Sequence, residues 1–163
     1  MRESLVEIVL LALAGAVLVV VAGGMLSRCS GAGAAHPVVR ASWTLTPGVL
    51  NPAVTQATIG STVCRRGWTS EIRPPVSYTN ALKLRGLRSY RLRGSPSAYQ
   101  EDHLISLELG GNPTDPRNLW PEPYPRASEV DRIENELNDG VCSGRLTLAE
   151  AQDQESALKH RDG

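Results

Sequence analysis

A chain of 163 residues provides one domain of ordinary size and an appendage, and the absence of an internal repeat excludes a repeat architecture. Phenylalanine is absent, so a hydrophobic core has to rely on aliphatic residues, three Trp and four Tyr. The net charge is zero, but residues 61–100 carry eight basic residues and one acid, whereas residues 101–163 carry fourteen acids and six basic residues. This asymmetry indicates a polyanion-binding surface beside a metal-binding surface, or else two solvated surfaces of opposite charge.

The first predicted element is an apolar segment at residues 5–26, which is interrupted only by Glu7. It is long enough to cross a bilayer, which takes roughly 20 residues. The segment predicts an exported protein, either membrane-anchored outside the cytoplasm or secreted after signal cleavage near Ala32-Gly33-Ala34. We expect residues 1–35 to form the signal peptide or anchor, residues 36–50 a linker and residues 51–163 the folded domain.

Export also bears on the three cysteines, because paired cysteines oxidise outside the cytosol. Cys29 lies in or next to the export segment, which leaves Cys64 and Cys142 in the folded domain. These two cysteines predict one disulfide bond, whose long loop would stabilise the fold by about 4 kcal/mol. Two buried free thiols and a zinc site are the alternatives, although the chain lacks the CxxC spacing typical of zinc.

The first half of the folded domain reads as one strand and one helix. The β-rich run at residues 54–63 predicts a strand, and Pro74-Pro75 ends any regular element there. Residues 77–80 can cap a helix that begins near Asn80 and places its leucines on one face.

The second half predicts a hairpin followed by two helices. Residues 99–109 alternate as in a strand, residues 110–113 form a turn, and a short strand at 118–120 ends at Pro121. A helix is expected at 126–140, with Ser128 as its N-cap and Gly140 as its end. A second helix is expected at 147–160, with Thr147 as N-cap and Glu150 at the third helical position.

Asp102 and His103 stand side by side in the predicted hairpin, and Asn118 follows its turn. Adjacent strand residues point to opposite faces, so Asp102 and His103 are suited to different roles, one as a metal ligand and the other as a base. A histidine with its ordinary pKa near 6.5 can take a proton from water, and a divalent cation can stabilise the charge that develops on a phosphate. Asn118 can hold the histidine ring through a side-chain or a backbone hydrogen bond.

DHLISLELGG followed by NLW resembles the HNH endonucleases, the ββα-metal finger family, in Asp102-His103, Gly110-Gly111 and Asn118-Leu119. Most of residues 45–155 also resemble a group of exported bacterial HNH-like proteins. The resemblance implies an α+β fold with a ββα-metal core and flanking helices after the N-terminal transmembrane or signal helix. It implies a nuclease that hydrolyses phosphodiester bonds with one divalent metal ion, Mg²⁺ before Mn²⁺, Ca²⁺, Ni²⁺ or Zn²⁺.

By this resemblance, Asp102 is a metal ligand, His103 is the general base, and Asn118 supports the hairpin and orients His103. The chain departs from the family at the third motif position, usually His or Asn, because no histidine occurs between 103 and 160. Asp131 and Glu134 share one face of the following helix, and either is the expected substitute ligand. If neither reaches the site, the domain is a catalytically degenerate binding protein of the cell envelope, or its Asp-His pair is only structural.

Five basic residues are expected to bind phosphates of nucleic acid through contacts that do not depend on sequence, with DNA placed before RNA although the sequence does not distinguish them. They are Arg65, Arg66, Arg73, Lys83 and Arg85. No helix-turn-helix or zinc-finger pattern that would read bases is present. The membrane, through residues 5–26 if they are not cleaved, and an inhibitor or envelope partner remain as further expected partners.

Overall fold

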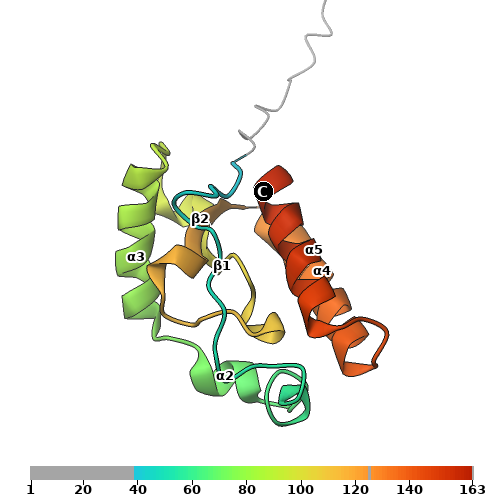
Figure 1. Cartoon of the computed structure of the whole chain (residues 1–163). Helices are drawn as coiled ribbons and strands as arrows, with labels where there is room; N and C mark the ends of the chain where they lie inside the picture. The colour runs from blue at the N-terminus through green and yellow to red at the C-terminus, as the bar shows by residue number, and fades with distance from the viewer. Residues whose placement is uncertain (1–38, 125, 163) are drawn as a thin grey trace, which may run out of the picture. The chain divides into compact units, whose positions relative to one another are not determined.

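A two-stranded antiparallel sheet lies between helix α3 on one side and the paired helices α4 and α5 on the other (Figure 1). The computed structural model describes residues 39–124 and 126–162. Strand β1 (Tyr99–His103) pairs with β2 (Leu119–Pro123), so Asp102 is opposite Trp120 and His103 is opposite Leu119. Helix α4 follows β2 directly, which confirms the α+β class and gives a hairpin followed by a helix.

The helices of the described part differ in length. Three are long: α3 spans Val76–Ser89, α4 spans Arg126–Cys142 and α5 spans Leu148–Arg161. Helix α2 is a single short element at Trp68–Ile72. Four 3₁₀ turns connect these elements: η1 (Ile59–Ser61), η2 (Pro96–Ala98), η3 (Leu107–Leu109) and η4 (Pro116–Asn118).

The strand predicted at residues 99–109 ends earlier, at His103, and η3 follows it. The cause is the side chain of Asn118, which bonds the backbone of the next residues as a strand would. Its Oδ1 accepts from the Ile105 N–H at 3.0 Å, and its Nδ2 donates to the Ile105 carbonyl, also at 3.0 Å. The alternating pattern therefore predicted neither the backbone nor the burial of this segment, because residues 104–107 are all buried.

The strand predicted at residues 54–63 is absent, and turns with η1 take its place. Threonine hydroxyls satisfy the backbone locally in this segment. Thr58 Oγ1 donates to the Ala53 carbonyl at 2.9 Å, and Thr62 Oγ1 donates to the Thr58 carbonyl at 2.8 Å. Such local bonds compete with a sheet ladder, and β propensity alone does not reveal them.

Two helix starts also differ from the sequence prediction. Helix α3 begins at Val76, directly after Pro75, so Asn80 lies inside it. Helix α4 begins at Arg126, so Ser128 is an internal residue, and the helix continues past Gly140 to Cys142. The left-handed turn falls at Gly144, whose φ is +75°. The start of α5 is confirmed, since Thr147 and Glu150 form a complete capping box.

The predicted disulfide bond between Cys64 and Cys142 is present, with Cα atoms 5.5 Å apart. It joins the segment before α2 to the last residue of α4. From Val39 onward, part of the segment predicted as a linker packs into the folded unit, because Val39 and Ala41 are buried against Leu104 and Trp120.

The predicted export segment lies outside the described residues. Within 39–124 and 126–162, no helix is long and apolar enough to cross a membrane.

Candidate functional site

A small polar cavity of about 60 Å³ opens where β1, α4 and the end of α2 meet. Its wall includes Asp102 and His103 from β1, Asp131 and Glu134 from α4, and Arg73 from the residue after α2. Five residues singled out from the sequence are thus brought to one place, although they are spread over 62 positions of the chain (Arg73 to Glu134). The volume is enough for an ion or one to two water molecules, since water occupies about 30 Å³ in the liquid.

His103 is held by one ring nitrogen only. Its Nε2 lies 3.1 Å from the carbonyl oxygen of Pro113, and because a carbonyl can only accept, Nε2 carries the hydrogen. The other nitrogen, Nδ1, has no hydrogen bond to any residue that the structure describes. Burial lowers the pKa of the imidazole, and the bond to Pro113 only partly opposes this. The ring is therefore a neutral base with a free lone pair on Nδ1.

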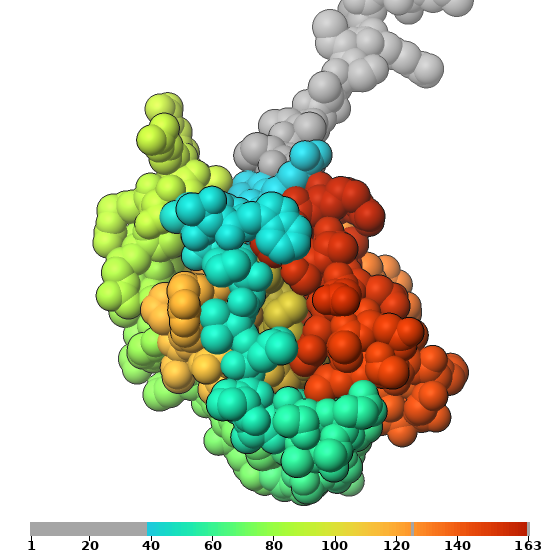
Figure 2. Space-filling model, in the orientation of Figure 1, coloured from blue at the N-terminus to red at the C-terminus, as the bar shows by residue number. Residues whose placement is uncertain are grey.

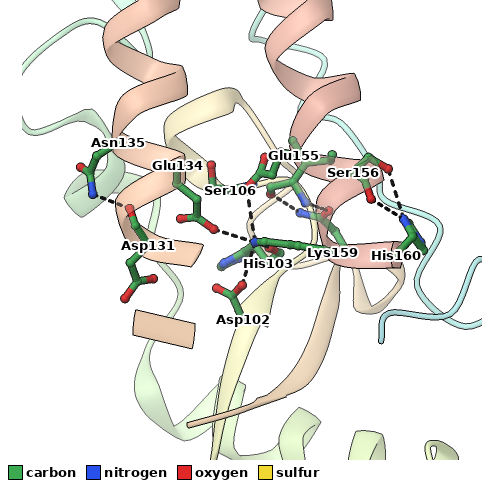
Figure 3. Close-up of polar contacts among 12 residues, drawn as sticks. Asp102, His103, Ser106, Asp131, Glu134, Asn135, Glu155, Ser156, Lys159 and His160 are labelled. Carbon is green, nitrogen blue, oxygen red and sulfur yellow. Dashed lines mark hydrogen bonds and ion pairs between the residues drawn. The ribbon is translucent and has the colours of Figure 1, made fainter. Parts of the chain in front are cut away.

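His160 provides the contrast within the same chain. Its Nε2 lies 3.1 Å from the Thr46 carbonyl and its Nδ1 lies 2.8 Å from the Ser156 carbonyl (Figure 3). The ring also stacks on Trp43, with centroids 3.5 Å apart. Both nitrogens of His160 are occupied, so this histidine is a structural residue.

Asn118 is fully buried and uses both ends of its amide. Besides its two bonds to Ile105, Nδ2 donates to the Asn112 carbonyl at 3.0 Å and Oδ1 accepts from the Val49 N–H at 3.3 Å. None of these hydrogen bonds goes to His103. Asn118 fixes the loop one residue before Pro113, whose carbonyl holds the His103 ring. Asn118 thus bonds the hairpin and the loop that precedes Pro113, and any effect on the orientation of His103 would pass through that loop.

Lys159 occupies the centre of a buried group of carboxylates (Figure 3). Its Nζ lies 2.7 Å from Asp102 Oδ2, 2.6 Å from Glu134 Oε1 and 3.3 Å from Glu155 Oε1. It also donates to the main-chain carbonyl of His103. Burial favours the neutral amine, but the surrounding carboxylates outweigh it and raise the pKa of Lys159 well above its ordinary value. Lys159 is therefore a permanent cation at this position.

One ammonium cannot neutralise all the acids around it. Burial would raise the pKa of Asp102, yet the nearby Lys159 charge holds that pKa below its ordinary value. Burial raises the pKa of Glu134 and of Glu155 above the ordinary value. Burial, with the charge of Asp102 as the next cause, raises the pKa of Glu122 to about 9. The group therefore retains protons at neutral pH, and Asp102 is its most stable anion.

Glu122 is the least satisfied member of this group. Its side chain is completely buried, and neither carboxylate oxygen finds a hydrogen-bond donor in the described part of the chain. A protonated Glu122 can itself donate to the Asp102 carboxylate, which is close enough to affect its pKa. Such a carboxyl–carboxylate bond satisfies both groups only while one proton is shared.

The expected metal ion meets suitable donors here but not a complete site. Carboxylate oxygens are the ligands that Mg²⁺ and Ca²⁺ prefer, and Asp102, Asp131 and Glu134 supply them on one cavity wall. Lys159 nevertheless already uses one oxygen of Asp102 and one of Glu134. Among residues 39–124 and 126–162, no three His, Cys, Asp or Glu side chains form a group that could hold a metal ion.

No family model, curated protein or solved structure matches this chain. The chemistry of the site therefore rests on its own geometry.

The five basic residues expected to bind phosphates do not gather at the cavity. Of the five, only Arg73 lies on its wall. Arg65 is paired with Glu71 at 2.5 Å, and Lys83 donates to the Tyr99 carbonyl at 3.1 Å, which ties α3 to β1. Arg66 lies beside the disulfide bond, and Arg85 lies on the α3 side of the sheet.

The sequence prediction missed Lys159, Glu155, Glu122 and the Pro113 carbonyl. Glu155 and Lys159 are four residues apart in a predicted helix, which indicates an ion pair but not its burial. Glu122 lies between two prolines, beyond the predicted end of the short strand. A main-chain carbonyl carries no signal in the sequence.

Proposed function

We propose that this protein hydrolyses phosphodiester bonds in nucleic acid, with His103 as the general base. The observation that carries the proposal is the His103 ring, fixed through Nε2 on Pro113 and free at Nδ1, on the wall of a polar cavity. A base must be neutral, oriented and within reach of water to accept a proton. His103 meets the first two conditions, and the cavity has room for the water.

Arg73 supports phosphate as the group that is attacked. It is the one basic residue among the five expected phosphate contacts that shares the cavity wall with His103. Among the described residues it forms no ion pair, so its guanidinium is available for a phosphate oxygen. In this arrangement, Nδ1 of His103 takes a proton from water while Arg73 holds the phosphate that the water attacks.

The resemblance to HNH endonucleases adds one divalent cation, Mg²⁺ before the others, which Asp102 with Asp131 or Glu134 would hold. Such an ion stabilises the negative charge that develops on the phosphate and its leaving oxygen.

A second candidate function is binding without catalysis, and Lys159 favours it. The ammonium already supplies positive charge between Asp102 and Glu134, where a metal ion would be expected. A hairpin and helix locked by an internal cation would keep their shape without a metal ion. The protein would then bind a polyanion or a cell-envelope partner through its basic surface and would not hydrolyse phosphodiester bonds.

Plasmid nicking by the oxidised full-length protein separates the two candidates. The assay uses Mg²⁺, Mn²⁺, Ca²⁺, Ni²⁺ or Zn²⁺ in turn, and EDTA, with His103→Gln as the test variant. His160→Gln is the matched control, because that histidine has both nitrogens occupied away from the cavity. We expect nicking that EDTA abolishes, that His103→Gln reduces by at least a hundredfold and that His160→Gln retains. Folded protein that nicks with none of these ions supports the binding function.

A further inference from the structure

A larger pocket lies on the opposite side of the sheet from the carboxylate group, against α3. Its volume is about 320 Å³, within the range of sites for small molecules. Figure 2 shows the face on which residues 39–58 (blue-green), α3 (yellow-green) and the segment before β2 (orange) meet. Leu45, Leu82 and Leu119 give the pocket apolar walls, and Tyr90 adds an aromatic ring.

The charged residues around this pocket favour an anionic ligand. Residues 76–98, which include all of α3, contain five basic residues and no acid. Arg85 lines the pocket, and Arg88, Arg91 and Arg93 are exposed beyond it on the same segment. None of these four arginines forms an ion pair with a residue that the structure describes. A ligand with a net positive charge would be repelled, and a phosphate would be attracted.

The inside of the pocket requires hydrogen-bond donors. Glu101 is the single acid on its wall. Its Oε2 is buried and has no hydrogen-bond partner within the described ranges. Burial raises the pKa of Glu101 to about 8, so this carboxyl keeps its proton at neutral pH in the free protein, and a ligand that brings N–H groups stabilises the carboxylate form. The ligand therefore combines an anionic part, an apolar body and donors directed at Glu101.

We propose that this pocket binds a base of the nucleic-acid strand, with guanine preferred. A nucleotide has the three required parts, because its flat base packs against leucine and tyrosine side chains and its phosphate reaches Arg85. Guanine presents two adjacent N–H donors on its Watson–Crick edge, and one carboxylate accepts both. Adenine presents a single amino group on that edge and satisfies Glu101 less well.

The position of Glu101 relates this pocket to the cavity of His103. The two residues are two apart in β1, about 7 Å along the strand, but Glu101 lines the pocket against α3 whereas His103, at the end of the strand, lines the cavity on the side of the carboxylate group. The proposal extends the proposed function, because it names the part of the substrate that is recognised, but base binding does not require cleavage.

Isothermal titration calorimetry of the full-length protein with GMP and AMP, in EDTA, tests the proposal. We expect GMP to bind at least tenfold more tightly than AMP. Glu101→Gln, which keeps the size of the side chain, is expected to reduce this ratio to near one. Arg85→Ala is expected to weaken the binding of both nucleotides by a similar factor. The control Arg132→Ala, at an exposed position of α4 and outside the pocket wall, is expected to change it little.

Equal affinity for GMP and AMP, or a preference for GMP that survives Glu101→Gln, overturns the proposal. Circular dichroism establishes that each variant is folded before it is titrated. Since EDTA removes divalent cations, a protein that never nicks DNA can still pass this test, and an active nuclease can still fail it. The two proposals therefore stand or fall separately.

Discussion

The ammonium nitrogen of Lys159 lies 2.7 Å from Oδ2 of Asp102, the residue that the resemblance to HNH endonucleases predicts as a metal ligand. The same nitrogen lies 2.6 Å from Glu134, one of the two expected substitute ligands. Three elements, β1, α4 and α5, are thus joined by one positive charge. This charge supports the shape of the site and at the same time competes with any metal ion for its oxygens.

Lys159→Met should therefore destabilise the fold and open the carboxylates to cations. Removal of one partner from a buried ion pair costs about 3–5 kcal/mol, because the remaining charges are left unpaired. We expect a loss of this size in the free energy of unfolding, measured with urea. Terbium luminescence should show at least tenfold tighter Tb³⁺ binding in the variant, provided that it is studied below its unfolding temperature.

Lys83→Met is the matched control for this substitution. Lys83 is also partly buried, but it bonds a main-chain carbonyl rather than a carboxylate. Its loss should change Tb³⁺ binding little. If Lys159→Met binds Tb³⁺ no better than the wild type, Lys159 does not exclude cations from the site.

Asn118→Ala should be among the most destabilising single substitutions that leave the charges unchanged. The amide of Asn118 satisfies four backbone groups in the loop after β1 and in the N-terminal segment. A buried group left without a partner costs about 1–3 kcal/mol, so we expect a loss of about 3 kcal/mol or more. Urea denaturation measures it, with Asn135→Ala as the control because Asn135 is exposed on α4.

Loss of the Asn118 side chain should also change the position of the His103 ring, because both are bonded to the loop that contains Asn112 and Pro113. Asn118 holds the Asn112 carbonyl, and the next carbonyl, that of Pro113, holds the imidazole. The NMR signals of the His103 ring should shift in Asn118→Ala, and those of the His160 ring should not. A variant with wild-type stability and an unchanged His103 ring would show that the loop is held by other contacts.

The sequence predicts the parts of the fold that depend on local signals. The capping box at Thr147 and Glu150, the apolar faces of the helices and the pairing of Cys64 with Cys142 need only spacing and residue type. The site was predictable where residues adjacent in sequence also act together, as Asp102 and His103 do. Asp131 and Glu134 reach the same cavity because one helix face presents both.

What the sequence could not predict depends on contacts between distant segments. Lys159 lies 57 positions from Asp102 in sequence, and the sequence pattern of the last helix does not show what covers its buried face. The end of β1 at His103 depends on a side chain that is 15 positions further along the chain. The strand predicted at residues 54–63 was wrong because local backbone bonds and threonine hydroxyls, not the backbone of a neighbouring strand, satisfy that segment.

Glu122 should make the stability of the protein fall as the pH rises. Burial, followed by the charge of Asp102, raises the pKa of Glu122 in the folded state from 4.5 to about 9. Between these two values the folded state binds one proton more than the unfolded state, so the free energy of unfolding decreases with increasing pH. The contribution is fully present below about pH 4.5 and is lost as the pH approaches 9.

Glu122→Gln isolates this contribution, because glutamine has the same shape and does not titrate. Urea denaturation at pH 5, 7 and 9 should show the variant gaining stability relative to the wild type at each step, by a few kcal/mol in total. Glu136→Gln, at an exposed position of α4, should show no such trend. A constant difference between Glu122→Gln and wild type across this range would mean that Glu122 is ionised in the folded protein.

The disulfide bond between Cys64 and Cys142 should contribute much of the stability of the α2 region. The two residues are 78 positions apart, and the chain-entropy model gives about 4–5 kcal/mol for a loop of this length. The bond holds the segment that leads to Arg73 against the end of α4. The double variant Cys64→Ser with Cys142→Ser should therefore unfold at a lower urea concentration, and its free energy of unfolding should be lower by that amount.

Reduction of the wild type provides the control for these substitutions. Cys142 is exposed, so dithiothreitol should lower the free energy of unfolding of the wild type by the same amount and leave that of the double variant unchanged. If dithiothreitol destabilises both proteins equally, the reductant acts somewhere other than this bond.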